Sequence, residues 1–156
     1  MKTKNKEIWL YLDDVRVPTS EDWLVVRSYD AFVTQVRLNG LENFELISLD
    51  HDLGDTAMSE YYTNAKPNYQ INYNNILEKT GMDCVKWLVN HSIETNIPLP
   101  TVKVHSANPI GAANMMGYIN NYYKNCRQPE VCTKVEIAHT YITPLTPDER
   151  VAKYKK

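Results

Sequence analysis

The sequence predicts an α/β domain built on a central parallel sheet. Short apolar runs typical of buried strands alternate along the chain with amphipathic segments of helical period, which is the pattern of consecutive βαβ units. The chain has 156 residues, of which 43% are hydrophobic and 23% charged, and these values are ordinary for one globular domain. We therefore expect a single domain over 1–156 with five parallel strands.

Five segments have the composition and the boundaries of strands, at 8–12, 24–27, 46–49, 101–104 and 135–142. Turn-forming or polar residues bound each run, and Pro144 and Pro147 stop the last one. Because helical segments separate most of them, these strands are expected to run parallel.

Three segments have helical spacing and recognisable ends. The first covers about 30–39, with Ser28 or Asp30 as its N-cap. The second follows a capping box formed by Thr80 and Asp83, and the third begins with Asn108 as N-cap and proline at the first helical position. The expected core faces of the second and third helices are Met82, Val85, Leu88, Val89 and Ile93, and Ala112, Met115, Met116, Ile119, Tyr122 and Tyr123.

Two segments do not follow this alternation of strands and helices. Residues 55–79 have no clear period and are rich in tyrosine and asparagine, so they are expected to form an inserted loop, either a lid or surface decoration. Residues 145–156 are expected to form a basic C-terminal tail.

Three of the predicted strands end in ionisable or polar side chains: Asp13-Asp14, Asp50-His51-Asp52 and His105-Ser106. The carboxyl ends of parallel strands lie at one edge of a sheet, where ligands bind in open α/β folds. If the three strands are neighbours, these side chains share a crevice. The alternative for the central stretch is a solvated loop after a core strand.

The carboxylates predict a metal site. Asp13, Asp14, Asp50 and Asp52 would repel one another in one crevice, so a divalent cation is the simplest explanation for gathering them. Carboxylate ligands favour Mg²⁺ or Mn²⁺, whereas a histidine ligand would shift the preference towards Mn, Fe or Zn. Arg16 is the alternative source of positive charge.

A phosphate site is expected beside the metal. The helix that begins at Asn108 presents backbone N–H groups and the positive end of its dipole at the same edge. His51 or His105 would transfer protons there, because imidazole titrates near neutrality. The alternatives are that Ser106 only caps the helix and that Arg16 only neutralises an aspartate.

The overall charge limits the partners. A formal net charge of −2 argues against binding of duplex DNA but leaves room for a small phosphorylated ligand. No apolar run is long enough to cross a membrane, the first residues lack the apolar core of a signal peptide, and the three cysteines form no CxxC pair. A cytoplasmic protein is therefore expected.

Five motifs in series resemble the cyclic-phosphate-processing receiver domains, which are relatives of response-regulator receivers. They lie at 12–18, at Trp23 with Val26-Arg27, at 47–54, at 80–83 and at 104–112. The resemblance implies a flavodoxin-like, three-layer receiver fold. It also implies an acidic metal pocket of Asp13, Asp14 and Asp50, with further phosphate chemistry at His51, Asp52, His105, Ser106 and Asn108.

The chain departs from receivers at two places. Receivers carry a lysine at the end of the fifth strand, where this chain offers Thr143 before a proline, and this weakens a phosphorelay role. The other departure is the insertion at 55–79, which would reshape the substrate site.

The leading hypothesis is therefore a metal-dependent phosphoesterase that opens a cyclic phosphate on a nucleotide, an RNA end or a cyclic nucleotide. In it His51, His105 and Asp50 are catalytic, and Ser106, Asn108 and Arg16 bind phosphate. One alternative is a non-catalytic receiver phosphorylated on Asp50. The other is a protein that sequesters a cyclic nucleotide without hydrolysing it.

Overall fold

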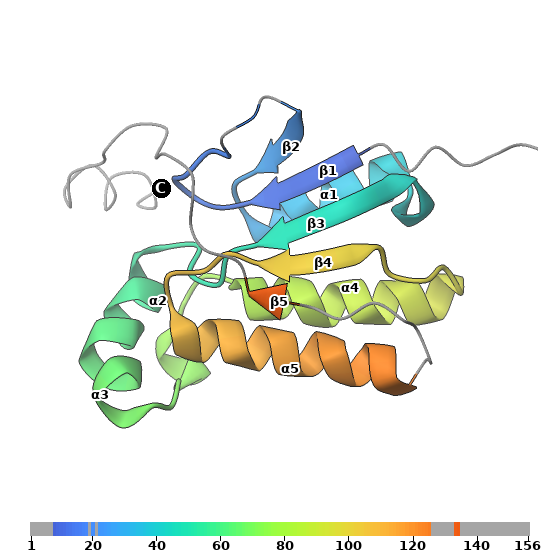
Figure 1. The fold of residues 1–156 in the computed structure, drawn as a ribbon. Coiled ribbons are helices and arrows are strands. Elements are labelled where there is room, and N and C mark those ends of the chain that lie inside the picture. The colour runs from blue at the N-terminus through green and yellow to red at the C-terminus, as the bar shows by residue number, and fades with distance from the viewer. Residues whose placement is uncertain (1–7, 19, 21, 126–132, 135–156) are drawn as a thin grey trace, which may run out of the picture.

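A five-stranded parallel sheet forms the centre of the computed structural model, which describes residues 8–18, 20, 22–125 and 133–134 (Figure 1). The strands are β1 (Ile8–Leu12), β2 (Trp23–Val26), β3 (Phe44–Leu49), β4 (Thr101–Val104) and β5 (Thr133–Lys134). Their order across the sheet is β2-β1-β3-β4-β5, which is the flavodoxin-like order. The predicted α/β class and parallel sheet are confirmed.

The predicted strand positions hold with small shifts. β3 begins two residues earlier than expected. The prediction started after Glu45 because that residue is charged, but Glu45 lies within the strand and accepts a hydrogen bond from Nε1 of Trp9 at 2.6 Å. The expected fifth strand at 135–142 lies outside the described residues, as do Thr143 and the tail at 145–156. The described part of the fifth strand is Thr133–Lys134, which pairs with β4 in parallel.

Three long helices cover the sheet: α1 (Tyr29–Asn39), α4 (Gly81–Thr95) and α5 (Pro109–Asn125). α4 packs against both α1 and α5. Three right-handed crossovers all move across the sheet in one direction: β2-α1-β3, β3-α4-β4 and β4-α5-β5. All three therefore lie on the same face. The described residues of the β1–β2 connection form no helix, so the described part of the chain shows two of the three expected layers.

The predicted helix starts are confirmed where hydrogen bonds identify the cap. Ser28, rather than Asp30, caps α1, because its side chain accepts from the backbone N–H of Ala31 at 3.2 Å. Thr80 and Asp83 form the complete capping box of α4.

One expected core position is wrong. Ile93 of α4 is 61% exposed, because Ser92 takes the buried position of that last turn. The Ser92 hydroxyl is hydrogen-bonded to the hydroxyl of Tyr122 at 2.7 Å, so a polar contact replaces the apolar one that the periodicity predicted.

The inserted segment is largely helical, which corrects the expectation of an irregular loop over 55–79. It contains α2 (Asp55–Glu60), a π-helical stretch (Tyr61–Ala65), the short α3 (Lys66–Asn68) and a 3₁₀ turn (Tyr73–Asn75). Buried Glu60 holds it together by accepting hydrogen bonds from the side chains of Asn64 and Asn75 and from the backbone of Asn72. These contacts have no periodic apolar signature.

The core lies between the sheet and the three long helices. Its largest fully buried side chains include Phe32, Phe44, Leu88 and Ile119, which come from α1, β3, α4 and α5. Within the described ranges, no helix combines the length and the apolar character needed to cross a lipid bilayer.

Candidate metal and phosphate site

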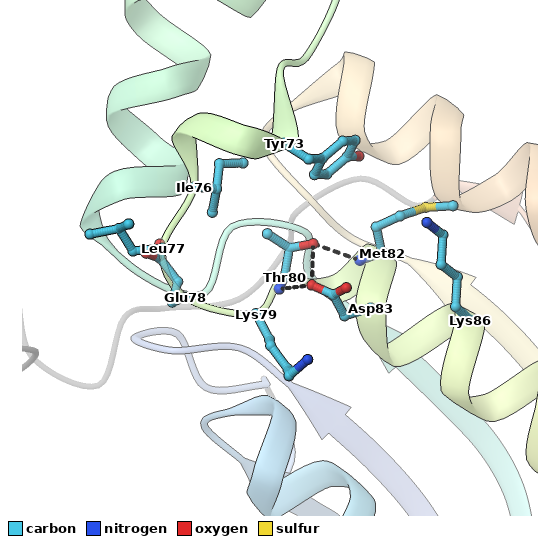
Figure 2. Close-up of a pocket in the computed structure, with 9 residues that line it drawn as sticks. All are labelled: Tyr73, Ile76, Leu77, Glu78, Lys79, Thr80, Met82, Asp83 and Lys86. Atoms are coloured by element: carbon cyan, nitrogen blue, oxygen red, sulfur yellow. Dashed lines mark hydrogen bonds between the residues drawn. The ribbon is translucent and has the colours of Figure 1, made fainter.

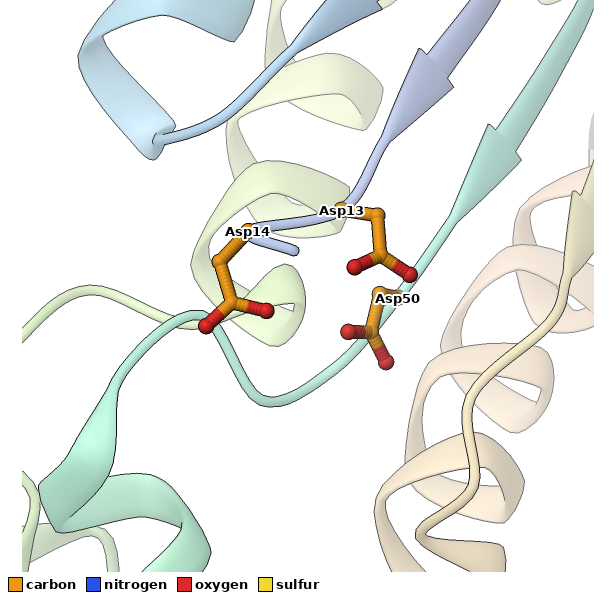
Figure 3. Close-up of side chains that lie close together, drawn as sticks. All are labelled: Asp13, Asp14 and Asp50. Atoms are coloured by element: carbon orange, nitrogen blue, oxygen red, sulfur yellow. The ribbon is translucent and has the colours of Figure 1, made fainter. Parts of the chain in front are cut away.

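Three carboxylates meet at the carboxyl edge of the sheet. Asp13 and Asp14 follow β1 and Asp50 follows β3, and these two strands are neighbours (Figure 3). One oxygen from each side chain lies within 4.8 Å of the others, and all three residues are buried. The crossover direction reverses between β1 and β3, so the cluster lies at the position where flavodoxin-like folds bind ligands.

Arg16 supplies part of the charge that these acids require. Its Nε lies 3.0 Å from Oδ2 of Asp13, and its Nη2 lies 3.4 Å from Oδ2 of Asp50. The guanidinium of Arg27 fixes the loop that carries Asp13 and Arg16, because it donates to the backbone oxygens of these two residues at 2.9 and 2.6 Å. A buried cluster of three carboxylates is a typical set of ligands for a divalent cation such as Mg²⁺ or Mn²⁺.

Asp13 is the most firmly held of the three acids. Its Oδ1 accepts the N–H groups of Val15 and Arg16 at 2.9 and 2.8 Å, and its Oδ2 faces Arg16 and His105. Burial alone would raise the pKa of Asp13, but the His105 hydrogen bond, the Arg16 charge and the two N–H donors lower it to about 2. Asp13 is therefore ionised at neutral pH, and both of its carboxylate oxygens are held by contacts within the protein.

The pKa of Asp50 is shifted in the opposite direction. Burial and the neighbouring charge of Asp13 raise its pKa well above the usual value, with a further contribution from Asp14, while Arg16 opposes the rise. One oxygen accepts the backbone N–H of His51 at 2.8 Å. A buried acid that is costly to ionise without another cation fits a ligand for Mg²⁺ or Mn²⁺, with Asp14 beside it.

His105 supports the acidic cluster by contacting Asp13. Its Nε2 lies 3.1 Å from Oδ2 of Asp13, and its Nδ1 lies 2.7 Å from Oγ of Ser48. A carboxylate only accepts, so Nε2 carries the proton, and neutral Nδ1 then accepts from the Ser48 hydroxyl. Burial lowers the pKa of His105 against the effect of Asp13, and the ring stacks on Tyr11 with centroids 4.3 Å apart. The geometry suits a residue that positions Asp13.

His51 belongs to a second hydrogen-bonded group. Its Nδ1 lies 2.6 Å from Oδ1 of Asp52, and its Nε2 lies 2.9 Å from the hydroxyl of Tyr73 in the inserted segment. The same Asp52 oxygen accepts from Nδ2 of Asn108 at 3.2 Å. His51 itself is fully buried, whereas Tyr73 is 36% exposed, so the hydrogen-bonded chain Asp52–His51–Tyr73 ends at a partly exposed side chain.

Two glycines allow this close packing. A Cβ atom at Gly111, in the first turn of α5, would overlap the ring of His51. A Cβ at Gly81, the first residue of α4, would overlap the backbone oxygen of Asp50. The N–H of Gly81 donates to the backbone oxygen of His51 at 2.8 Å, so the start of α4 fixes the loop that follows β3.

Ser106 and Asn108 organise the start of α5. Oδ1 of Asn108 accepts the N–H of Gly111 at 2.9 Å, which is the predicted N-cap contact, and Oγ of Ser106 accepts the N–H of Asn108 at 3.0 Å. Both residues are buried. Two of the three predicted phosphate-binding residues therefore lie at the start of α5, where they hold the backbone in place, whereas Arg16 lies in the acidic cluster.

The structure brings together most of the predicted site residues but divides them into two groups. Asp13, Asp14, Asp50, Arg16 and His105 form one group, and Asp52, His51 and Asn108 form the other. Among the described residues, the metal-type cluster comprises three of the four predicted ligands and omits Asp52, whose Oδ1 contacts His51 and Asn108.

Sequence reasoning missed three residues of the site. Ser48 had a usable signal, since it is the polar residue in an otherwise apolar strand run. Tyr73 and Asn114, whose Nδ2 donates to the Tyr73 hydroxyl at 3.3 Å, had none that separates them from the many other tyrosines and asparagines.

Comparison with known proteins gives one match. The model of a family described as the cyclic-phosphate processing receiver domain matches residues 8–121, nearly three quarters of the chain. The match covers β1 to β4 and every residue of both groups above. No curated protein and no solved structure matched the chain significantly.

Proposed function

We propose, from the premise that this chain belongs to the cyclic-phosphate processing receiver domain family, that it is a metal-dependent phosphodiesterase that opens a cyclic phosphate. The observation that carries the proposal is the buried cluster of Asp13, Asp14 and Asp50, in which each side chain offers an oxygen within 4.8 Å of the others. Receiver domains bind Mg²⁺ through such an acidic pocket. A phosphoesterase additionally requires groups for proton transfer, and the Asp52–His51 pair supports that role.

Asp14 and Asp50 would hold the cation, because the oxygens of Asp13 already accept from Arg16, His105 and two backbone N–H groups. A bound divalent ion polarises a phosphoryl group and activates water. Arg16 keeps the charges of the pocket balanced, and His105 holds Asp13 in place. These contacts support a site prepared for a cation and a phosphate together.

In the proposed reaction a water oxygen forms a bond to phosphorus and one of the two ring P–O bonds breaks. The proton lost by the water is balanced by a proton delivered to the released sugar oxygen, and the product is a phosphomonoester. His51 is the better candidate for the proton transfers, because its hydrogen-bonded chain ends at partly exposed Tyr73. Both histidines have two bonded ring nitrogens, but the partners of His105 named above, Ser48 and Asp13, are both buried.

The test is incubation of the purified protein with 2′,3′-cyclic nucleotides, RNA ending in a cyclic phosphate and cyclic dinucleotides, each with Mg²⁺, Mn²⁺ or a chelator. Phosphorus NMR follows ring opening directly. We expect turnover of at least one substrate class that the chelator and Asp50→Asn abolish, while Asp30→Asn, which changes an exposed aspartate of α1, retains it. No turnover under any condition rejects the proposal, and tight binding of unchanged ligand would identify a sequestering protein instead.

A second function has one supporting observation. Asp50 lies at the carboxyl end of the central strand β3 inside the acidic cluster, as the phosphorylated aspartate of a receiver does. Such a role predicts labelling by acetyl phosphate that Asp50→Asn removes. Labelling without turnover of any cyclic phosphate would favour the signalling role.

A further inference from the structure

A pocket lies between the inserted segment and the start of α4 (Figure 2). Its volume is about 300 Å³, at the lower end of the range for small-molecule sites. Its wall is mixed: Tyr73, Ile76 and Met82 contribute aromatic and apolar surface, and the other lining residues are mostly polar or charged, among them Thr80 and Lys86. A cavity of this size suits one ring system, whereas a dinucleotide would exceed it.

The aromatic ring of Tyr73 lies beside this pocket and is held in place. Its hydroxyl is held by Nε2 of His51 at 2.9 Å and by Nδ2 of Asn114 at 3.3 Å, so both of its torsions are constrained although 36% of the residue is exposed. A fixed and partly exposed ring stacks a planar ligand with little loss of side-chain entropy, and nucleobases stack on such rings.

The charges around the pocket do not oppose an electron-rich ligand. Glu78 is turned to the inserted segment, where it accepts from the hydroxyl of Thr56 and from the N–H of Ala57, and Asp83 accepts from the N–H of Thr80 in the capping box. The Lys79 ammonium lies 4.9 Å from the ring centroid of Tyr29. Lys86 is exposed and lies on the side of Met82, where it can donate to acceptors of a bound ring (Figure 2).

The pocket shares a wall with the acidic site. Thr80 lines it, and the next residue, Gly81, packs against the backbone of Asp50 and donates to that of His51. On the other side, Tyr73 joins the pocket to His51 through its hydroxyl. The pocket and the acidic cluster are therefore connected through Thr80–Gly81 and through the contact between Tyr73 and His51.

We infer that this pocket binds the base of a nucleoside cyclic phosphate by stacking it on Tyr73, so that the inserted segment confers selectivity for nucleoside substrates over cyclic phosphates that carry no base. The inference rests on the proposed function for the identity of the reacting group. It assigns a role to residues 73–86 that the acidic cluster alone does not require.

The experiment compares adenosine 2′,3′-cyclic phosphate with glycerol 1,2-cyclic phosphate, which has the same reacting ring and no base. Tyr73→Leu removes the stacking face, and Ile76→Trp fills the pocket. We expect each to raise KM and Kd for the adenosine ligand about tenfold. Kd for the glycerol ligand should stay unchanged, whereas turnover of both ligands should fall in Tyr73→Leu, because this variant also removes the hydroxyl bonded to Nε2 of His51. Tyr69→Leu, at an 81% exposed position of the same insertion, and Leu38→Trp, at a 76% exposed position of α1, are the matched controls.

Kd is measured by NMR titration, so the result does not depend on turnover. If the wild type hydrolyses neither compound but the variants weaken only the adenosine ligand, the proposed function fails and the base pocket stands. An equal loss for both ligands, or no loss for either, overturns the inference, as does a change of the same size in the control variants.

Discussion

Replacing Asp50 by asparagine should stabilise the metal-free protein, although the residue is buried and hydrogen-bonded. Asparagine preserves the shape of the side chain and keeps an oxygen that accepts the backbone N–H of His51. It removes a charge that lies near Asp13 and Asp14 and opposite Arg16. The sign of the effect therefore depends on whether repulsion exceeds attraction.

The distances give an approximate answer. At the 4.8 Å limit, two unit charges interact by about 3.5 kcal/mol at an effective dielectric constant of about 20. Two such repulsions amount to about 7 kcal/mol, and the contact with Arg16 at 3.4 Å returns about 5 kcal/mol. The remainder is about 2 kcal/mol in favour of Asp50→Asn, which corresponds to a rise in Tm of about 4–8 °C for a chain of this size.

Thermal and urea denaturation of the chelator-treated proteins measure this difference. Saturating Mg²⁺ should reverse it, because an ion at 100 times its Kd stabilises the wild type by about 2.7 kcal/mol and loses a ligand in the variant. Asp30→Asn is the control for a loss of charge at an exposed site, with an expected change of at most about 0.5 kcal/mol. A lower Tm for metal-free Asp50→Asn, or equal stabilisation of both proteins by Mg²⁺, would refute the reasoning.

Three other predictions concern pH, helix packing and His105. Burial raises the pKa of Asp50 in the folded protein, so its contribution to stability is fully present below the unfolded pKa of 3.8 and is lost as pH rises through the folded pKa. The stability advantage of Asp50→Asn in denaturation curves should therefore widen from pH 4 towards neutrality. A constant difference would contradict the assignment. Gly111→Ala should displace the ring of His51 and lower turnover at least about tenfold. In contrast, Gly117→Ala in the same helix meets nothing within 4 Å and should stabilise by about 0.5–1 kcal/mol; equal kinetics for the two variants would count against a role of His51. His105→Ala leaves Ser48 and Asp13 without their buried partner and should cost about 2 kcal/mol in urea denaturation, and a neutral result would remove His105 from the supporting structure.

The sheet and the long helices were predictable because their signals are local. β1 is a continuous apolar run, β4 alternates valines with Thr101 and Lys103, and α4 and α5 carry recognisable caps at Thr80 and Asn108. Convergence of Asp13, Asp14 and Asp50 was predictable as well, because parallel strands place their carboxyl ends at one edge.

The missed features depend on contacts between distant segments. The insertion is held by Glu60 and by Glu78 with Thr56, and such polar contacts leave no periodic pattern in the sequence. Tyr73 meets His51 across 22 positions of the chain, and the sequence does not distinguish it from ten other tyrosines. The division of labour between the two histidines likewise follows only from their partners.

The most direct measurement is the anomalous scattering of Mn²⁺ in a crystal of the wild-type protein. We expect one ion at the carboxyl edge of the sheet, in contact with oxygens of Asp14 and Asp50, and none at this place in Asp50→Asn. A crystal soaked to saturation that shows no anomalous peak among the three carboxylates would contradict the metal site on which the proposed chemistry depends.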